Sequence, residues 1–160
     1  EADAVLSASP INSENLRELH YTTMVLNESM RIYPPAWITA REAMEDDEIG
    51  GFPVPKGSQV YLSPFIVHRH PDFWDRAYVF DPERFNEDQS QGRHKFAFFP
   101  FGGGPRYCIG NNFAMMEMKV ILATLVHWFD FKPISKIPVA LDPLLTLRPK
   151  DPILVKIRKR

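Results

Sequence analysis

Apolar residues recur at helical spacing over residues 13–33, and this pattern predicts the first long helix of the chain. The helix has two apolar stripes on different sides, so we expect it to be buried. Pro34 and Pro35 end the pattern, because a residue that precedes proline avoids the helical conformation. The first stripe contains Leu16, Leu19, Thr23, Leu26, Met30 and Tyr33, and the second contains Tyr21, Met24, Val25 and Ile32.

A second helix is predicted from Asn112 to Phe129, and it is apolar on nearly all sides, which indicates a central position. Alternating β-prone residues at 37–43 and 58–65 predict two strands, and the glycine- and proline-rich residues 50–57 between them predict a turn. The remaining segments are predicted as a loop or a frayed end over 1–12, an irregular but aromatic-rich connection over 67–99, and short antiparallel strands at 139–149 and 152–160. The pattern therefore predicts a mainly α chain with small antiparallel β-sheets, which is α+β when classed alone.

Composition narrows the possible functions. The 160 residues are 44% hydrophobic, enough for one domain with a single core. A net charge of −1 gives no support for nucleic-acid binding, and the single cysteine excludes an intrachain disulfide. No apolar run has the length of a membrane span, and no signal-peptide pattern stands at the start. The polar beginning at Glu1 leads us to expect a piece of a longer protein.

One carboxylate is placed on the second apolar stripe of the first helix. Glu28 lies three residues before Arg31, a spacing at which the two side chains can meet. An exposed pair would contribute only a few tenths of a kcal/mol. A buried pair would need further partners, and Arg84 in the segment Asp81-Pro82-Glu83-Arg84-Phe85 can supply one. The second alternative predicts a structural tie between the helix and this loop.

The only cysteine, Cys108, follows a run of three glycines and Arg106, and it lies just before the second helix. A free cysteine is commonly an inert buried residue, but a helix N-terminus and a nearby cation favour a reactive thiolate. A zinc site needs more cysteine or histidine ligands at regular spacing, and a cysteine phosphatase would need arginine where Ala114 stands. A phosphate-binding loop lacks its motif, and a hydrolase would need His68 or His127 as base. A single thiolate fits haem, which brings the other ligands of its iron.

Three motifs in this order resemble those of the cytochrome P-450 family, over almost the whole chain from Leu16 onwards. They are Glu28-x-x-Arg31, Pro82-Glu83-Arg84-Phe85 and Phe101-x-x-Gly104-x-Arg106-x-Cys108-x-Gly110. The resemblance implies that residues 1–160 are the C-terminal haem-binding portion of one cytochrome P-450 domain, without its N-terminal part and distal oxygen-binding helix.

The resemblance also implies roles for single residues. Cys108 would be the proximal iron ligand of haem b, and no other catalytic residue is expected in this fragment. Arg106 and Arg41 would bind the propionates, and Glu28, Arg31 and Arg84 would be structural, as would His68. Other haem contacts are expected from Pro100, Phe101, Gly102 and Gly110, and substrate contacts from Ala36, Trp37, Ile38, Thr39, Leu144 and Leu145.

The activity implied for the parent protein is insertion of one oxygen atom from O2 into an apolar organic substrate. Electrons would come from a ferredoxin-, flavodoxin- or reductase-type donor, and NAD(P)H would act only through that partner. Arg93, Lys95 and Arg106 would favour a negatively charged partner. We expect the 160 residues alone to bind haem weakly and to lack coupled activity. A bacterial parent would be cytoplasmic and soluble, with any N-terminal targeting segment or anchor outside this chain. The alternatives are a non-catalytic haem–thiolate carrier or sensor, or an inactive remnant.

Overall fold

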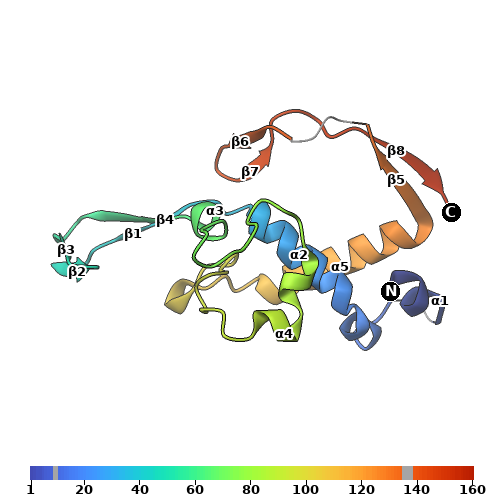
Figure 1. Cartoon of the computed structure of the whole chain (residues 1–160), viewed down its shortest axis with the longest axis horizontal. Helices are drawn as coiled ribbons and strands as arrows, with labels where there is room; N and C mark the ends of the chain where they lie inside the picture. Colours follow the sequence, from blue (N-terminus) through green and yellow to red (C-terminus); the bar gives the residue numbers. More distant parts are fainter. Residues whose placement is uncertain (9–10, 135–138) are drawn as a thin grey trace.

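Two helices form the centre of the molecule. The structure is a computed structural model that describes residues 1–8, 11–134 and 139–160. Helix α2 (His20–Ile32) packs against helix α5 (Asn111–Trp128) near the middle of the view in Figure 1. The shorter helical elements are α1 (Ala2–Ala8), α3 (Pro64–Val67) and α4 (Glu87–Ser90), with 3-10 turns η1 (Asn15–Glu18), η2 (Pro82–Phe85) and η3 (Gly104–Arg106).

The strands of the described residues form small antiparallel pairs. Figure 1 shows two of these pairs in one long arm, and two more in a C-terminal segment that arches over the helices. The arm contains β1 (Thr39–Glu42) with β4 (Gln59–Leu62) and β2 (Asp47–Ile49) with β3 (Phe52–Val54). The C-terminal pairs are β5 (Phe129–Pro133) with β8 (Val155–Lys159) and β6 (Leu141–Pro143) with β7 (Leu147–Pro149). The predicted fold class is confirmed.

The first long helix begins later than the sequence pattern predicts. Residues 15–18 form the 3-10 turn η1, and Leu19 leaves the helical region with ψ of 62° before α2 starts. The side chain of Asn12 accepts hydrogen bonds from the backbone N–H groups of Glu14 and Asn15, and such bonds compete with a helical backbone. The predicted end is correct, since α2 stops at Ile32, ahead of the two prolines.

Regular structure also occurs in segments that the sequence predicts as loop or turn. Residues 2–8 form helix α1, which packs on α5 through Val5 and Ala123, so the predicted loop is wrong there, while residues 9–10 lie outside the described part. The predicted turn at 50–57 is tighter than expected. Gly50 and Gly51 make the reversal with φ of 59° and 84°, and the next residues already form β3. Pro53 is tolerated there because β3 pairs on one side only.

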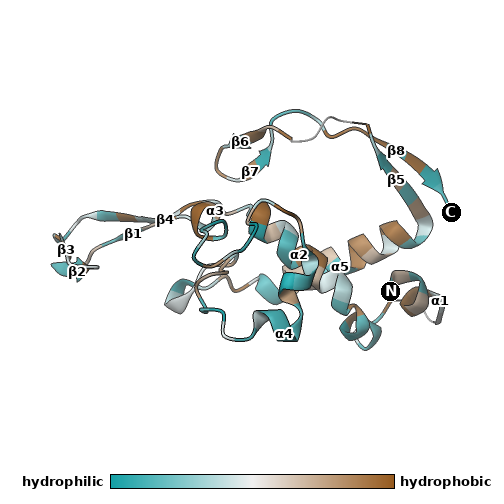
Figure 2. Cartoon of the chain, viewed as in Figure 1, coloured by the Kyte–Doolittle hydropathy of each residue, from teal (hydrophilic) through white to brown (hydrophobic). Residues whose placement is uncertain are grey.

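Helix α5 is central, as predicted, but it is not buried on all sides. Among the described residues it packs against α1, α2 and η1, and Ala123 is its one fully buried residue. Figure 2 shows the hydrophobic colouring of its C-terminal half, where α5 leads into the unpredicted strand β5. The large apolar residues of α5 that stay exposed are Phe113, Met116, Ile121, Leu125, Val126 and Trp128.

The irregular connection over 67–99 has its own small core. Trp74 and Ala97 are buried in it, and the Trp74 indole N–H donates to the Ala97 carbonyl over 3.2 Å. Phe85 and Phe98 pack against this pair, with their ring centroids 4.7 Å apart. The aromatic residues therefore help to order the connection, as the sequence predicts, and the regular elements within it, η2 and α4, are short.

Candidate functional site

Glu28 and Arg31 form a fully buried pair on the last two turns of α2. The Arg31 Nε donates to Glu28 Oε2 over 2.7 Å, and Arg31 Nη2 donates to Glu28 Oε1 over 2.8 Å. Both side chains are 0% exposed, so the alternative of an exposed helical ion pair is wrong. The two parallel bonds are the strongest geometry available to an arginine and a carboxylate.

Arg31 also holds the irregular connection. Its Nη1 donates to the carbonyl oxygens of His68 and Ala77, each over 2.8 Å, and its Nη2 donates to that of Val79 over 3.4 Å. These carbonyls lie 37 to 48 residues further along the chain. One guanidinium therefore fixes helix α2 to a segment that has little regular structure of its own.

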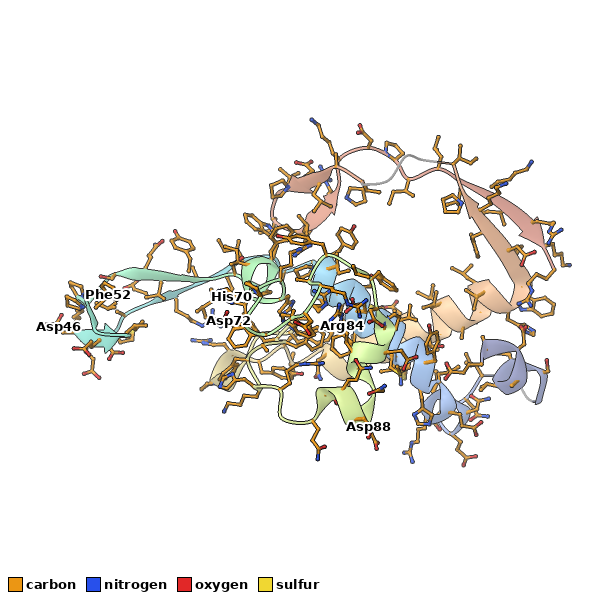
Figure 3. All side chains as sticks on the ribbon, viewed as in Figure 1. Asp46, Phe52, His70, Asp72, Arg84 and Asp88 are labelled. Carbon is orange, nitrogen blue, oxygen red and sulfur yellow. The ribbon has the colours of Figure 1, made fainter. Side chains whose placement is uncertain are left out.

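Arg84 joins this pair from η2. Its Nε lies 3.6 Å from Glu28 Oε1, and the backbone N–H of Asp81 donates to the same oxygen over 2.9 Å. The turn forms because Pro82 occupies its first position and the Asp81 side chain accepts from the N–H of Glu83. Figure 3 labels Arg84 in the crowded centre beside α2. The structure thus brings together the three residues that the sequence suggested as a structural tie.

Arg93 is half-buried and adjoins this cluster. Its guanidinium stacks 4.4 Å from the Trp74 ring centroid and donates to the carbonyls of Arg84 and Gln89. Burial lowers the pKa of Arg93, and the neighbouring Arg84 charge lowers it further. Lys95 stays exposed, with Nζ 4.9 Å from the Phe96 ring centroid. Arg93 is one of the three cations predicted to attract a redox partner, and its guanidinium is engaged in contacts within the chain.

The cysteine loop, residues 99–110 ahead of α5, presents Cys108 at the surface. The Cys108 N–H donates to the Phe101 carbonyl over 3.0 Å, which closes the loop. Gly102 takes a φ of 78°, which favours glycine. At Gly103 an added Cβ would come within 2.8 Å of the Phe96 ring, so a larger residue there would displace this side chain. The glycines thus let the backbone fold tightly while the thiol stays accessible.

Cys108 lines a cavity of about 360 Å³ whose walls are mostly apolar. The cavity is bounded by the end of α2, the start of β1, the cysteine loop and the first half of α5. Eight of the predicted site residues line it, namely Ala36, Thr39, Arg41, Pro100, Phe101, Gly102, Arg106 and Cys108.

The other predicted site residues do not line this cavity. A Cβ on Gly110 would lie 3.9 Å from Cys108 Sγ, so this glycine adjoins the thiol. The Trp37 indole N–H donates to the Leu144 carbonyl over 2.8 Å, which ties the start of the arm to the C-terminal segment. Ile38, Leu144 and Leu145 are exposed.

Two arginines lie on the cavity with the thiol. Arg41 Nη1 donates to Thr39 Oγ1 over 3.1 Å and to its neighbouring carbonyl at Ala40 over 2.8 Å. Arg106 is exposed, and its side chain has no hydrogen bond or ion pair within the described residues. A soft sulfur ligand, apolar walls and two cations match the iron, the flat ring and the two carboxylates of a haem. The residues present therefore fit this group.

The sequence did not identify six further lining residues. Met30 and Pro35 flank the end of α2, and their position beside Arg31 and Pro34 was the only local signal. The others reach the cavity through the packing of distant elements. The full set is Met30, Pro35, Pro64, Phe99, Ala114 and Met118.

His68 is buried between the end of α2 and the cysteine loop. Its Nε2 accepts a hydrogen bond from the backbone N–H of Phe99 over 2.9 Å. Burial, together with the charges of Arg31 and Arg69, lowers the pKa of His68 to about 4. The ring is therefore neutral at physiological pH, and since Nε2 accepts, its proton is on Nδ1.

In the described part of the chain, no group of three or more His, Cys, Asp or Glu side chains could hold a metal ion, and no helix is long and apolar enough to cross a membrane.

The mainly helical fold and the glycine-rich cysteine loop are typical of the C-terminal part of a haem–thiolate protein. The family model for cytochrome P-450 matches residues 1–157, and the chain belongs to this family. Its members are haem-dependent monooxygenases, a class of oxidoreductase, so membership implies a haem cofactor.

Curated relatives match along the same length. Cytochrome P-450 4V2 of Mus musculus is 39% identical over 165 residues, and that of Homo sapiens is 37% identical over 163 residues, each match covering 100% of this chain. Cytochrome P-450 3A29 of Sus scrofa is 38% identical over 154 residues, or 95% of this chain. The chain spans 31% of the length of each of these relatives.

Proposed function

We propose that this chain is the haem-binding part of a monooxygenase that inserts one oxygen atom from O2 into an apolar organic substrate. The observation that carries the proposal is the exposed Cys108 thiol, which opens on an apolar cavity together with Arg41 and Arg106. Family membership supports the same reading.

The residues of the chain would act by holding and orienting. Cys108 would bind iron as thiolate, and the tie from its N–H to the Phe101 carbonyl would keep the sulfur in place. Arg106 and Arg41 would neutralise the two propionates, and the apolar walls would exclude water from the ring. When bound, the haem supplies reductive activation of O2, which thiolate ligation favours.

The substrate would meet the cavity from the side of Ala36 and Thr39, which line it from the start of the arm. Apolar walls select an apolar molecule, since a polar one would lose hydrogen bonds to water there. One oxygen atom would enter a C–H bond as hydroxyl, and the other would leave as water after two electrons and two protons are supplied. A ferredoxin-, flavodoxin- or reductase-type protein would deliver the electrons, with NAD(P)H as the indirect source.

Isotopically labelled dioxygen tests this function in the full-length protein. We expect one labelled oxygen atom in the product from at least one member of an apolar probe panel of alkanes, fatty acids and steroids, when a reductase is present. Cys108→Ser should abolish this product. A haem-loaded, reducible protein that labels no member of the panel would contradict the proposal and favour a haem carrier or sensor.

A further inference from the structure

One buried residue, His68, connects the Glu28–Arg31 pair to the cysteine loop. The backbone carbonyl of His68 accepts from Arg31 Nη1 over 2.8 Å, while the ring of the same residue accepts from the Phe99 N–H over 2.9 Å. His68 thus contacts the end of α2 through its main chain and the start of the cysteine loop through its side chain. Arg31 and His68 are both 0% exposed, whereas the bond to the Phe99 N–H is partly buried.

The ring of His68 is held in one orientation. It contacts the rings of Phe98 and Phe99, whose centroids lie 5.1 Å and 5.2 Å away. Its Nδ1 is buried without a hydrogen bond of normal geometry, although the carbonyls of Met30 and Arg31 are near enough to favour its proton. The proton on Nδ1 therefore faces the end of α2, which leaves Nε2 free to accept from Phe99.

Phe99 also takes part in the hydrogen bonds that close the cysteine loop. The Phe99 carbonyl accepts from the Gly102 N–H over 3.0 Å, and the Phe101 carbonyl accepts from the Cys108 N–H over 3.0 Å. Phe99 also lines the cavity on which Cys108 opens. Without an acceptor at position 68, the Phe99 N–H would lose its protein partner, and the start of the loop would lose its hydrogen bond to His68.

We propose that His68 is a positioning residue for the thiolate, which fixes the start of the cysteine loop to helix α2 by accepting the Phe99 N–H. This inference rests on the proposed role of Cys108 as iron ligand. It assigns His68 no contact with the haem or the substrate. A packing role alone would need only the volume of the ring, whereas a positioning role needs an acceptor at the place of Nε2.

The test compares variants of the full-length, haem-loaded protein. The amide of His68→Gln can reach the place of Nε2, whereas the shorter His68→Asn cannot, and His68→Phe keeps the ring without an acceptor. We measure the transfer of haem to excess apomyoglobin and the share of thiolate-type band in the ferrous carbon monoxide spectrum. The exposed His70, labelled in Figure 3, provides the matched control His70→Phe.

We expect His68→Phe and His68→Asn to lose haem at least about tenfold faster than wild type and to lose part of the thiolate-type band. His68→Gln should stay within about threefold of wild type, and His70→Phe should equal it. Equal values for all three His68 variants, whether impaired or normal, would overturn the inference. If His68→Phe does not fold, the comparison of His68→Gln with His68→Asn decides whether an acceptor is needed. A wild-type protein without any thiolate-type band would instead overturn the proposed function.

Discussion

Replacing Glu28 with glutamine in the full-length protein should lower the free energy of unfolding by about 3–5 kcal/mol. The carboxylate accepts from Arg31 Nε, Arg31 Nη2 and the Asp81 N–H, and it is the only acidic side chain paired with the buried Arg31 and Arg84 in the described part of the chain. An amide keeps one accepting oxygen but places an NH2 donor where the second oxygen stood. Two buried cations would then lack a counter-charge.

Urea unfolding of the haem-loaded protein measures this change. Glu45→Gln provides the matched control, because Glu45 is exposed on the arm and the same loss of charge should cost less than about 0.5 kcal/mol there. If the two variants lose the same small amount of stability, the buried pair does not hold α2 to the connection over 67–99. A large loss in Glu28→Gln alone supports the tie that Arg31 makes to this connection.

Acid should destabilise the wild-type protein more than the His68→Gln variant. The pKa of His68 is about 4 in the folded chain and about 6.5 in an unfolded one, because burial and the charges of Arg31 and Arg69 disfavour the protonated ring. The unfolded state therefore binds the proton first as pH falls. The contribution of His68 to the free energy of unfolding is fully present above about pH 6.5. It falls by about 1.4 kcal/mol per pH unit as the pH drops towards about 4.

The stability difference between the two proteins isolates this residue, because all other titrating groups are shared. Relative to its value near neutrality, the advantage of wild type over His68→Gln should shrink by about 2 kcal/mol at about pH 5. The charged groups near the ring are the cations Arg31 on α2 and Arg69 next in sequence, and the uncharged rings of Phe98 and Phe99 also contact it. A difference that stays constant with pH would contradict the buried, neutral state of His68.

The sequence predicted the parts of the site in which chemistry restricts the choice of residue. A carboxylate on a buried helix face needs cationic partners, so the sequence predicts Arg31 and Arg84 beside Glu28, and the structure places both there. Cys108 could be singled out because glycines and an arginine surround a solitary thiol. The two long helices followed from their apolar spacing, which is the strongest local signal of secondary structure.

The rest depends on tertiary packing that local patterns do not encode. Met118 and Pro64 reach the cavity only because the cysteine loop, α3 and α5 meet there. The start of α2 was predicted too early because the Asn12 side chain competes for backbone N–H groups. Strand β3 was missed because Pro53 suggests a turn, although an edge strand tolerates it.

The central claim is that Cys108 is the thiolate ligand of a haem. The carbon monoxide difference spectrum of the ferrous full-length protein tests it most directly, with Cys108→Ser measured beside wild type. The account predicts a red-shifted, thiolate-type Soret band in wild type and its loss in the variant. A folded, haem-loaded wild-type protein without this band, or a Cys108→Ser variant that retains it, would contradict the account.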